Sequence, residues 1–166
     1  MDKTGTLTEG RPKLTDVISL GDMGEEDLLA VAAALERGSE HPLAEAIVEG
    51  ATFRGVEMQS AADFEAITGK GVQGTVQGRT AALGNAAMMT VLELDSTLAE
   101  ARANALRSEG KTAMFVAVDG RLAGIVAVAD PIKASTAEAI RTLHQLGLRV
   151  IMATGDNQRT AEAVAA

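Results

Sequence analysis

The sequence contains no cysteine, tryptophan or tyrosine, and only three phenylalanines among its 166 residues. Without cysteine the chain forms no disulfides and no thiolate metal sites, and it has no thiol for catalysis. The scarcity of aromatic rings argues against proteins that stack the bases of single-stranded nucleic acids. The net charge of −8 argues against binding to a phosphate backbone, which needs a basic surface. We therefore expect no nucleic-acid partner.

Long hydrophobic runs are also missing. The longest stretch without a charged residue, 80–92, contains Gly84 and Asn85 and is shorter than the roughly 20 residues that cross a bilayer. The chain opens without the basic and apolar segments of a secretory leader. Its 46% of apolar and 23% of charged residues are typical of a folded globular domain. We therefore expect an acidic, soluble domain with no direct insertion into a membrane.

The middle of the chain has the pattern of an antiparallel sheet with helices. Hydrophobic periodicity predicts helices at 25–37, 42–53 and 96–108, and extended segments around 17–20, 64–67, 72–76, 80–83, 112–118 and 121–129. The dipeptides at 77–78 and 119–120, Gln-Gly and Asp-Gly, are typical of two-residue hairpin turns.

The last part has a different pattern. A helix at 134–145, an apolar strand at 148–153 and a helix from 157 onward follow the order of a parallel sheet. We therefore expect an α/β chain of the α+β type in three parts. Residues 13–129 form the inserted domain, and 1–12 and 130–166 are two segments of a divided parallel-sheet domain.

The first residues contain the strongest motif, because positions 2–8 read DKTGTLT. A carboxylate such as Asp2 can attack the γ-phosphorus of a nucleotide and split hydrolysis into two easier steps. Gly5 lets backbone N–H groups close around phosphoryl oxygens, and Lys3 and Thr4 offer charge and hydroxyl contacts there. The motif resembles, residue for residue, the phosphorylation motif of P-type ATPases. The resemblance makes Asp2 the phosphorylated nucleophile, with Lys3 and Thr4 as further catalytic residues.

A second motif follows the last predicted strand. Positions 154–157 read TGDN, and a helix-capping turn explains such a string equally well. In the P-type ATPases, which belong to the haloacid dehalogenase-like superfamily, the matching threonine contacts the phosphoryl group. The resemblance therefore makes Thr154 a catalytic residue. The DPIK string at 130–133 resembles the family's hinge, with Asp130 and Lys133 as hinge residues, and it also fits a strand end followed by a helix start.

Three strings in the middle of the chain match the heavy-metal-transporting branch of the family in the same order. They are SEHPL at 39–43, GKGVQG at 69–74 and GN at 84–85. Taken singly, each is typical of a helix start or a turn. The resemblance implies that His41 lies against an adenine ring, that Glu40 accepts a hydrogen bond from its amine, and that the glycines let the nucleotide approach the backbone. It assigns ATP binding to Glu40, His41, Gly69, Gly71, Val72, Gly84, Asn85, Gly155 and Asp156. For the middle domain it implies a twisted antiparallel sheet of about six strands, flanked by two helical hairpins.

The SEHPL string also favours the copper-transporting group, with the zinc and cadmium group as the alternative. Transporters of this kind select their cargo with membrane helices and cysteines, and this sequence contains neither. His144 stands alone in its predicted helix, and the seven methionines are scattered as core residues are. We therefore expect no copper site in this chain. A soluble haloacid dehalogenase-like phosphatase is a further alternative, but it requires a second aspartate where this chain has Thr4.

The resemblance implies ATP and Mg²⁺ as cofactors. Asp2 and the Thr4 carbonyl oxygen are the expected Mg²⁺ ligands, and this set is incomplete because the family's second acidic segment is not in this sequence. The actuator domain and the transmembrane helices of the family are not in it either, and they are the expected partners in the parent protein. We therefore expect a nucleotide-binding region on the cytosolic face of a transporter in the cell membrane. By itself this chain should bind ATP without turnover.

Overall fold

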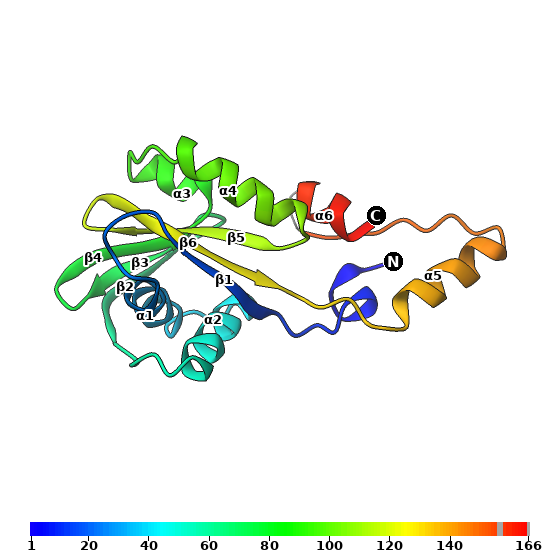
Figure 1. Ribbon diagram of the computed structural model, residues 1–166, viewed down its shortest axis with the longest axis horizontal. Coiled ribbons are helices and arrows are strands. Elements are labelled where there is room, and N and C mark those ends of the chain that lie inside the picture. Colours follow the sequence, from blue (N-terminus) through cyan, green and yellow to red (C-terminus); the bar gives the residue numbers. More distant parts are fainter. Residues whose placement is uncertain (156–157, 166) are drawn as a thin grey trace.

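The computed structural model describes residues 1–155 and 158–165. Its centre is a six-stranded sheet with the order β1-β6-β5-β4-β3-β2, in which every neighbouring pair is antiparallel (Figure 1). The strands are β1 (Lys13–Ser19), β2 (Ala61–Ile67), β3 (Gly71–Val76), β4 (Arg79–Gly84), β5 (Thr112–Val118) and β6 (Arg121–Ala129). The predicted antiparallel sheet of about six strands is confirmed.

Two tight turns determine the order of the central strands. Gln77 and Gly78 join β3 to β4 with φ values of 51° and 73°, and Asp119 and Gly120 join β5 to β6 with 48° and 70°. Two consecutive residues with positive φ form the hairpin turn whose twist matches that of the flanking strands. Both hairpins were predicted from these dipeptides, and both are confirmed.

Helices cover both faces of the sheet. The pair α1 (Glu25–Glu36) and α2 (Pro42–Phe53) packs on one face, and the pair α3 (Ala86–Val91) and α4 (Thr97–Ser108) packs on the other (Figure 1). Side chains alternate between the two faces along β5, so Val116 joins the core under α1 while its neighbour Phe115 joins the core under α4. The sheet therefore has one hydrophobic core on each of its two faces.

The short helix α3 was not predicted. It lies within the uncharged stretch 80–92, where no alternation of polar and apolar residues marks a helix face. Its start is stabilised by Asn85, whose Oδ1 accepts a hydrogen bond from the Met88 backbone N–H at 3.1 Å. Met88 and Met89 are fully buried, which anchors the helix on the sheet.

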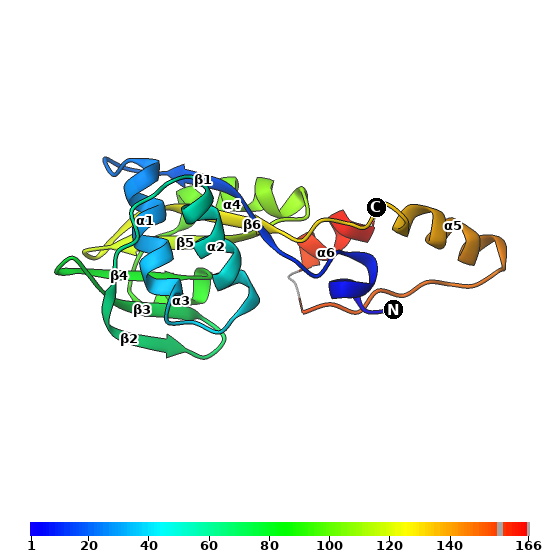
Figure 2. The same cartoon turned by 90° about the horizontal axis from the view of Figure 1, so that it is seen from below.

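The two ends of the chain lie together beside the sheet and its helices (Figure 2). The N-terminal end contains a turn at Lys3–Leu7, and the C-terminal end contains α5 (Thr136–Gln145) and α6 (Gln158–Ala165). The strand predicted at 148–153 is wrong, because only Ala153 forms a bridge there, to Asp2. A strand needs a hydrogen-bonded neighbour along its length, and here Leu148 and Ile151 are more than half exposed. None of the helices in the described residues is both long and apolar enough to span a membrane.

Candidate functional site

The two predicted catalytic segments meet through a short parallel pairing. The Lys3 N–H donates to the Ala153 carbonyl oxygen at 3.1 Å, and the Ala153 N–H donates to the Met1 carbonyl oxygen at 2.8 Å. Asp2 and Ala153 therefore form a parallel bridge, and Thr154 follows directly after the residue that faces Asp2. Ligands of open α/β sheets bind beyond the carboxyl ends of parallel strands, and this pairing brings Asp2 and Thr154 to that position.

The loop after Asp2 is held by the residues predicted as a hinge. The buried Thr8 hydroxyl donates to the Asp130 carboxylate, and it accepts from the Gly5 N–H at 3.2 Å. The Lys133 ammonium donates to the Gly5 carbonyl oxygen at 2.6 Å. Gly5 has a φ of +76°, which favours glycine. Asp130 and Lys133 thus fasten the loop to the chain that returns from β6.

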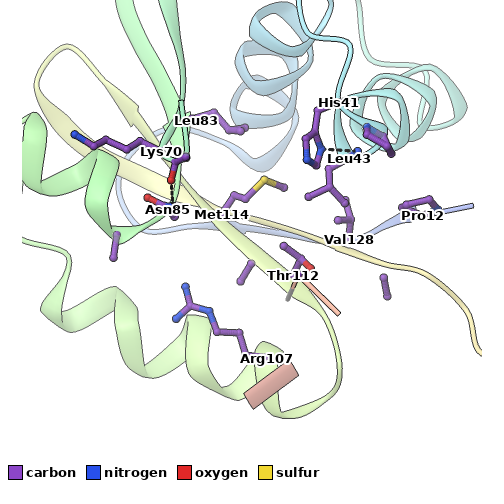
Figure 3. Close-up of a pocket in the computed structure, with 18 of the residues that line it drawn as sticks. Pro12, His41, Leu43, Lys70, Leu83, Asn85, Arg107, Thr112, Met114 and Val128 are labelled. Atoms are coloured by element: carbon purple, nitrogen blue, oxygen red, sulfur yellow. Dashed lines mark hydrogen bonds between the residues drawn. The ribbon is translucent and has the colours of Figure 1, made fainter. Parts of the chain in front are cut away.

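One open cleft of about 1490 Å³ is lined by this loop and by the sheet and its helices. Figure 3 shows the part of it that is lined by His41, Asn85 and Arg107. The predicted residues that line it are Lys3, Thr4, His41, Gly69, Gly71, Val72, Gly84, Asn85, Asp130, Thr154 and Gly155. Asp2, Glu40 and Lys133 do not line it, and Asp156 lies outside the described residues. The structure therefore brings most of the predicted site together, from segments far apart in the sequence.

His41 begins α2 and lies at the rim of the cleft (Figure 3). Its Nδ1 accepts a hydrogen bond from the Leu43 backbone N–H at 3.2 Å, so the side chain is the N-cap of the helix. The helix start predicted at Pro42 is confirmed. A neutral imidazole that accepts at Nδ1 carries its proton on Nε2, so the other edge of the ring is a hydrogen-bond donor.

The glycines of the cleft allow two strands to approach each other. Gly71 of β3 lies opposite Gly84 of β4. A methyl group at Gly71 would overlap the Leu83 carbonyl oxygen, and one at Gly84 would overlap the Lys70 carbonyl oxygen. Glycine is thus required by the packing of the backbone itself, a reason that the sequence did not reveal.

Asn85 ties the loop between β2 and β3 to the start of α3. Its Nδ2 donates to the Gly69 carbonyl oxygen at 2.8 Å while its Oδ1 caps the helix. Gly69 has a φ of +72° and open space around its Cα. The loop is therefore held in one shape on the side of the cleft opposite His41.

Glu36 is a cleft residue that the sequence analysis missed. It is the last residue of α1 and only 6% exposed, and its Oε2 has no hydrogen-bond partner among the described residues. Burial raises the pKa of the Glu36 carboxyl, and a hydrogen bond with Ser39 offsets only part of that effect. A buried acceptor without a partner costs free energy, and such groups are enriched at binding sites. The one feature of the sequence that could have indicated a role for Glu36 is its position directly after the apolar run 28–35.

Few groups in the cleft suit a metal ion. Among the described residues no three His, Asp or Glu side chains come together as a metal site would require. The DKTGTLT motif at 2–8 contributes two oxygen donors, the Asp2 carboxylate, which lies outside the cleft lining, and the carbonyl of Thr4, which lines it. One carboxylate and one carbonyl suit Mg²⁺, which keeps several waters and takes its remaining ligands from substrate phosphates.

Comparison with known proteins gives a match over the whole chain. A model of the haloacid dehalogenase-like hydrolase family matches residues 1–166. The chain is 61% identical over 165 residues to a copper-transporting P-type ATPase of Rhizobium leguminosarum bv. viciae, and 51% identical to a copper-exporting P-type ATPase of Legionella pneumophila. Each alignment covers 99% of this chain, but only 20% and 22% of those proteins. The chain thus spans about a fifth of the length of these curated relatives.

Solved structures give the same result. The crystal structure of a zinc-transporting PIB-type ATPase in the E2.Pi state matches with a TM-score of 0.78 and 35% identity, over 99% of this chain and 26% of that one. The catalytic CPx-ATPase domain CopB-B matches with 0.68 and 27%, over 99% and 54%. Sequence identity is higher to the two copper-transporting relatives, at 61% and 51%, than to these solved structures, at 35% and 27%. The chain therefore belongs to the haloacid dehalogenase-like hydrolase family, as a segment related along its whole length to copper-transporting P-type ATPases.

Proposed function

We propose that this chain is the ATP-binding and phosphate-accepting region of a copper-transporting P-type ATPase. In this proposal residues 13–129 bind the nucleotide, and 1–12 and 130–166 belong to the phosphorylation domain. The observation that carries it is the single cleft lined by Thr4 and Thr154 at one end and by His41 and Gly71 at the other. A nucleotide whose base lies at the second end would direct its phosphates toward the first.

We propose that the adenine base binds between Glu36 and His41. The apolar side chains of Val72, Leu83 and Met114 line the cleft close to them in the fold and suit the faces of a purine. The Glu36 carboxylate accepts a hydrogen bond from the exocyclic amine, which gives its orphaned Oε2 a partner. Glu36 replaces Glu40 in this role, because Glu40 does not line the cleft.

The chemistry follows from the phosphorylation motif. A carboxylate oxygen of Asp2 attacks the γ-phosphorus, the bond between that phosphorus and the β–γ bridging oxygen breaks, and ADP leaves with the electron pair. Lys3, Thr4 and Thr154 are the proposed groups that stabilise negative charge on the transferred phosphoryl. The Asp2 carboxylate and Thr4 carbonyl would hold Mg²⁺, whose charge reduces the repulsion between carboxylate and phosphate.

In the complete transporter, the actuator and transmembrane domains would convert the aspartyl-phosphate into export of copper. This region would then lie on the cytosolic face of the membrane, with copper bound elsewhere as the cargo. Gly155 and Asp156 remain proposed nucleotide contacts.

Titration of ¹⁵N-labelled protein with ATP tests the nucleotide site. The backbone amides of Glu36, His41, Gly69, Gly71 and Asn85 should shift together, because they lie around one end of the cleft. Adenosine should shift the same set, since the base is recognised there. The proposal fails if these amides stay still, or if only residues of the terminal segments respond.

A further inference from the structure

One wall of the cleft is formed where helix α4 leads into strand β5. From the last turn of α4 and the start of β5, Arg107 and Thr112 line the cleft (Figure 3). Gly110, which lies between the two elements, lines it as well. Helix α6 packs against this wall, and the Thr160 hydroxyl donates to the Lys111 carbonyl oxygen at 3.0 Å. The wall therefore adjoins the terminal segments that include the phosphorylation motif.

Several groups of this wall repel the negative charge of a phosphate chain. The C-terminal end of a helix exposes carbonyl oxygens and has a partial negative charge, and Glu100 of α4 also lines the cleft. A triphosphate that passes here needs a cation at this point. Arg107 is the one basic side chain in the last turn of α4.

Arg107 is held in place on one side and open on the other. Its guanidinium carbon lies 5.9 Å from the centre of the buried Phe115 ring, and its side chain is only 13% exposed. Nη1 donates to Glu100 Oε2 at 2.9 Å and to Asn104 Oδ1 at 3.0 Å. Nε and Nη2 have no hydrogen-bond partner within the described part of the chain. Figure 3 shows the guanidinium directed into the cleft.

We propose that Arg107 binds the triphosphate chain of the nucleotide through the free Nε and Nη2 groups. A planar guanidinium with two N–H groups on one edge matches two phosphate oxygens. The aromatic ring and the ion pair keep that edge in position before the nucleotide arrives. Glu100 orients Arg107 but also repels the phosphates. This inference rests on the nucleotide-binding function proposed above, and it assigns the phosphate chain to α4.

Comparing the affinities for ATP and for adenosine tests this contact, because adenosine has the base and sugar but no phosphates. A lost phosphate contact weakens the binding of ATP alone, whereas a general disturbance of the site weakens both. Affinities are measured by calorimetry without Mg²⁺ at one fixed ionic strength, for wild type, Arg107→Gln, Glu100→Gln and Arg102→Gln. Arg107→Gln should weaken ATP about tenfold, the effect of losing roughly 1.4 kcal/mol of charge-assisted hydrogen bonding, and should leave adenosine unchanged. Glu100→Gln should strengthen ATP about twofold or more, because it removes a negative charge. Arg102 is exposed on the same helix and outside the cleft, so Arg102→Gln should have little effect on ATP.

Three results would contradict the inference. In one, Arg107→Gln loses affinity for ATP and for adenosine to the same extent. In another, Arg107→Gln and Arg102→Gln lose the same affinity for ATP. The third is unchanged ATP binding in both Arg107→Gln and Glu100→Gln, which would mean that neither side chain lies near the phosphates. If Arg107→Gln does not fold, as judged by its thermal unfolding, Arg107→Lys and Glu100→Gln decide the question. If wild type binds neither ATP nor adenosine, the proposed nucleotide-binding function itself is wrong.

Discussion

Glu36, the last residue of α1, and His41, the N-cap of α2, line the same cleft from the two ends of one short connection. The connection therefore presents a buried carboxyl group and an imidazole ring to the same cleft. An amine donor and a flat apolar surface in one ligand would satisfy both groups. Adenine has both features, and this is the basis of the first two predictions.

Replacing Glu36 with glutamine should make the protein more stable and weaken its binding of ATP. The raised pKa of Glu36 means that the folded protein holds this proton more tightly than the unfolded chain does. The stability that this gives is complete below 4.5, the ordinary pKa of a glutamate, and is lost as the pH rises through the pKa of the folded state. At pH 7, Glu36→Gln should therefore raise the free energy of unfolding by about 1 kcal/mol, and the gain should vanish near pH 4. Urea unfolding at both pH values measures this.

Glu36→Gln should also raise the dissociation constant for ATP about fivefold, because a hydrogen bond to a neutral amide is worth about 1 kcal/mol less than one to a carboxylate. Glu40→Gln is the matched control and should change the dissociation constant less than about twofold. If Glu40→Gln weakens ATP and Glu36→Gln does not, the assignment of the adenine contact to Glu36 is wrong.

The two roles of His41 can be separated by two substitutions. Asparagine is a good N-cap, so His41→Asn should keep the stability of α2 while ATP binding weakens about fivefold from loss of the ring. His41→Ala should lose the ring and also about 1 kcal/mol of stability, because the Leu43 N–H loses its partner. Thermal unfolding and calorimetry distinguish these effects. Unchanged ATP affinity in both variants would leave His41 with the helix cap alone.

Gly71→Ala should destabilise the protein by about 2 kcal/mol, because the new methyl group would overlap the Leu83 carbonyl oxygen across the β3–β4 pair and the φ of +155° disfavours a side chain. Gly21→Ala is the control, since its methyl group would meet nothing within 4 Å and its φ is not positive. Urea unfolding should show a change within about 0.5 kcal/mol for the control. Equal stability of the two variants would contradict the close approach of the strands.

In the transporter proposed above, Asp2→Asn should abolish the acid-stable phosphoenzyme and leave ATP binding nearly unchanged. In this chain alone, wild-type Asp2 should already be inert. Phosphoryl transfer depends on positioning and on charge neutralisation. Here Asp2 is exposed, and among the described residues its one pairing is the bridge to Ala153. Incubation with γ-labelled ATP and Mg²⁺, followed by an acid quench, measures both cases. Label that persists on the wild-type chain and disappears in Asp2→Asn would show that the isolated region keeps its activity.

Cu(I) should not form a stoichiometric complex with this chain. The sequence offers two histidines, no cysteine and seven methionines, and the described residues bring no three His, Asp or Glu side chains together. Cu(I) prefers thiolate and clustered thioether ligands. A chromophoric Cu(I) chelator should therefore retain all its copper when the protein is added. A one-to-one complex that withdraws copper from the chelator would mean that this region takes part in cargo binding.

Local patterns in the sequence were sufficient for most of the secondary structure. The helices α1, α2 and α4 and the β3–β4 and β5–β6 hairpins follow from periodicity and turn residues, because these depend on neighbours a few positions apart. The strand predicted at 148–153 failed for the opposite reason. Its formation depends on a pairing partner, and only the segment around Asp2 supplies one.

The DKTGTLT motif at 2–8 was enough to predict the family, and the pattern of strands and turns was enough to predict a six-stranded antiparallel sheet. That Glu36, and not Glu40, lines the cleft became visible in the folded chain alone. Both carboxylates lie within one short stretch, and which of them is buried depends on how α1 packs on the sheet. The tertiary structure also decided that Asp2 pairs with Ala153 and that Arg107 faces the cleft. Such relationships join residues distant in sequence, so the packing of the whole chain, and no local pattern, determines them.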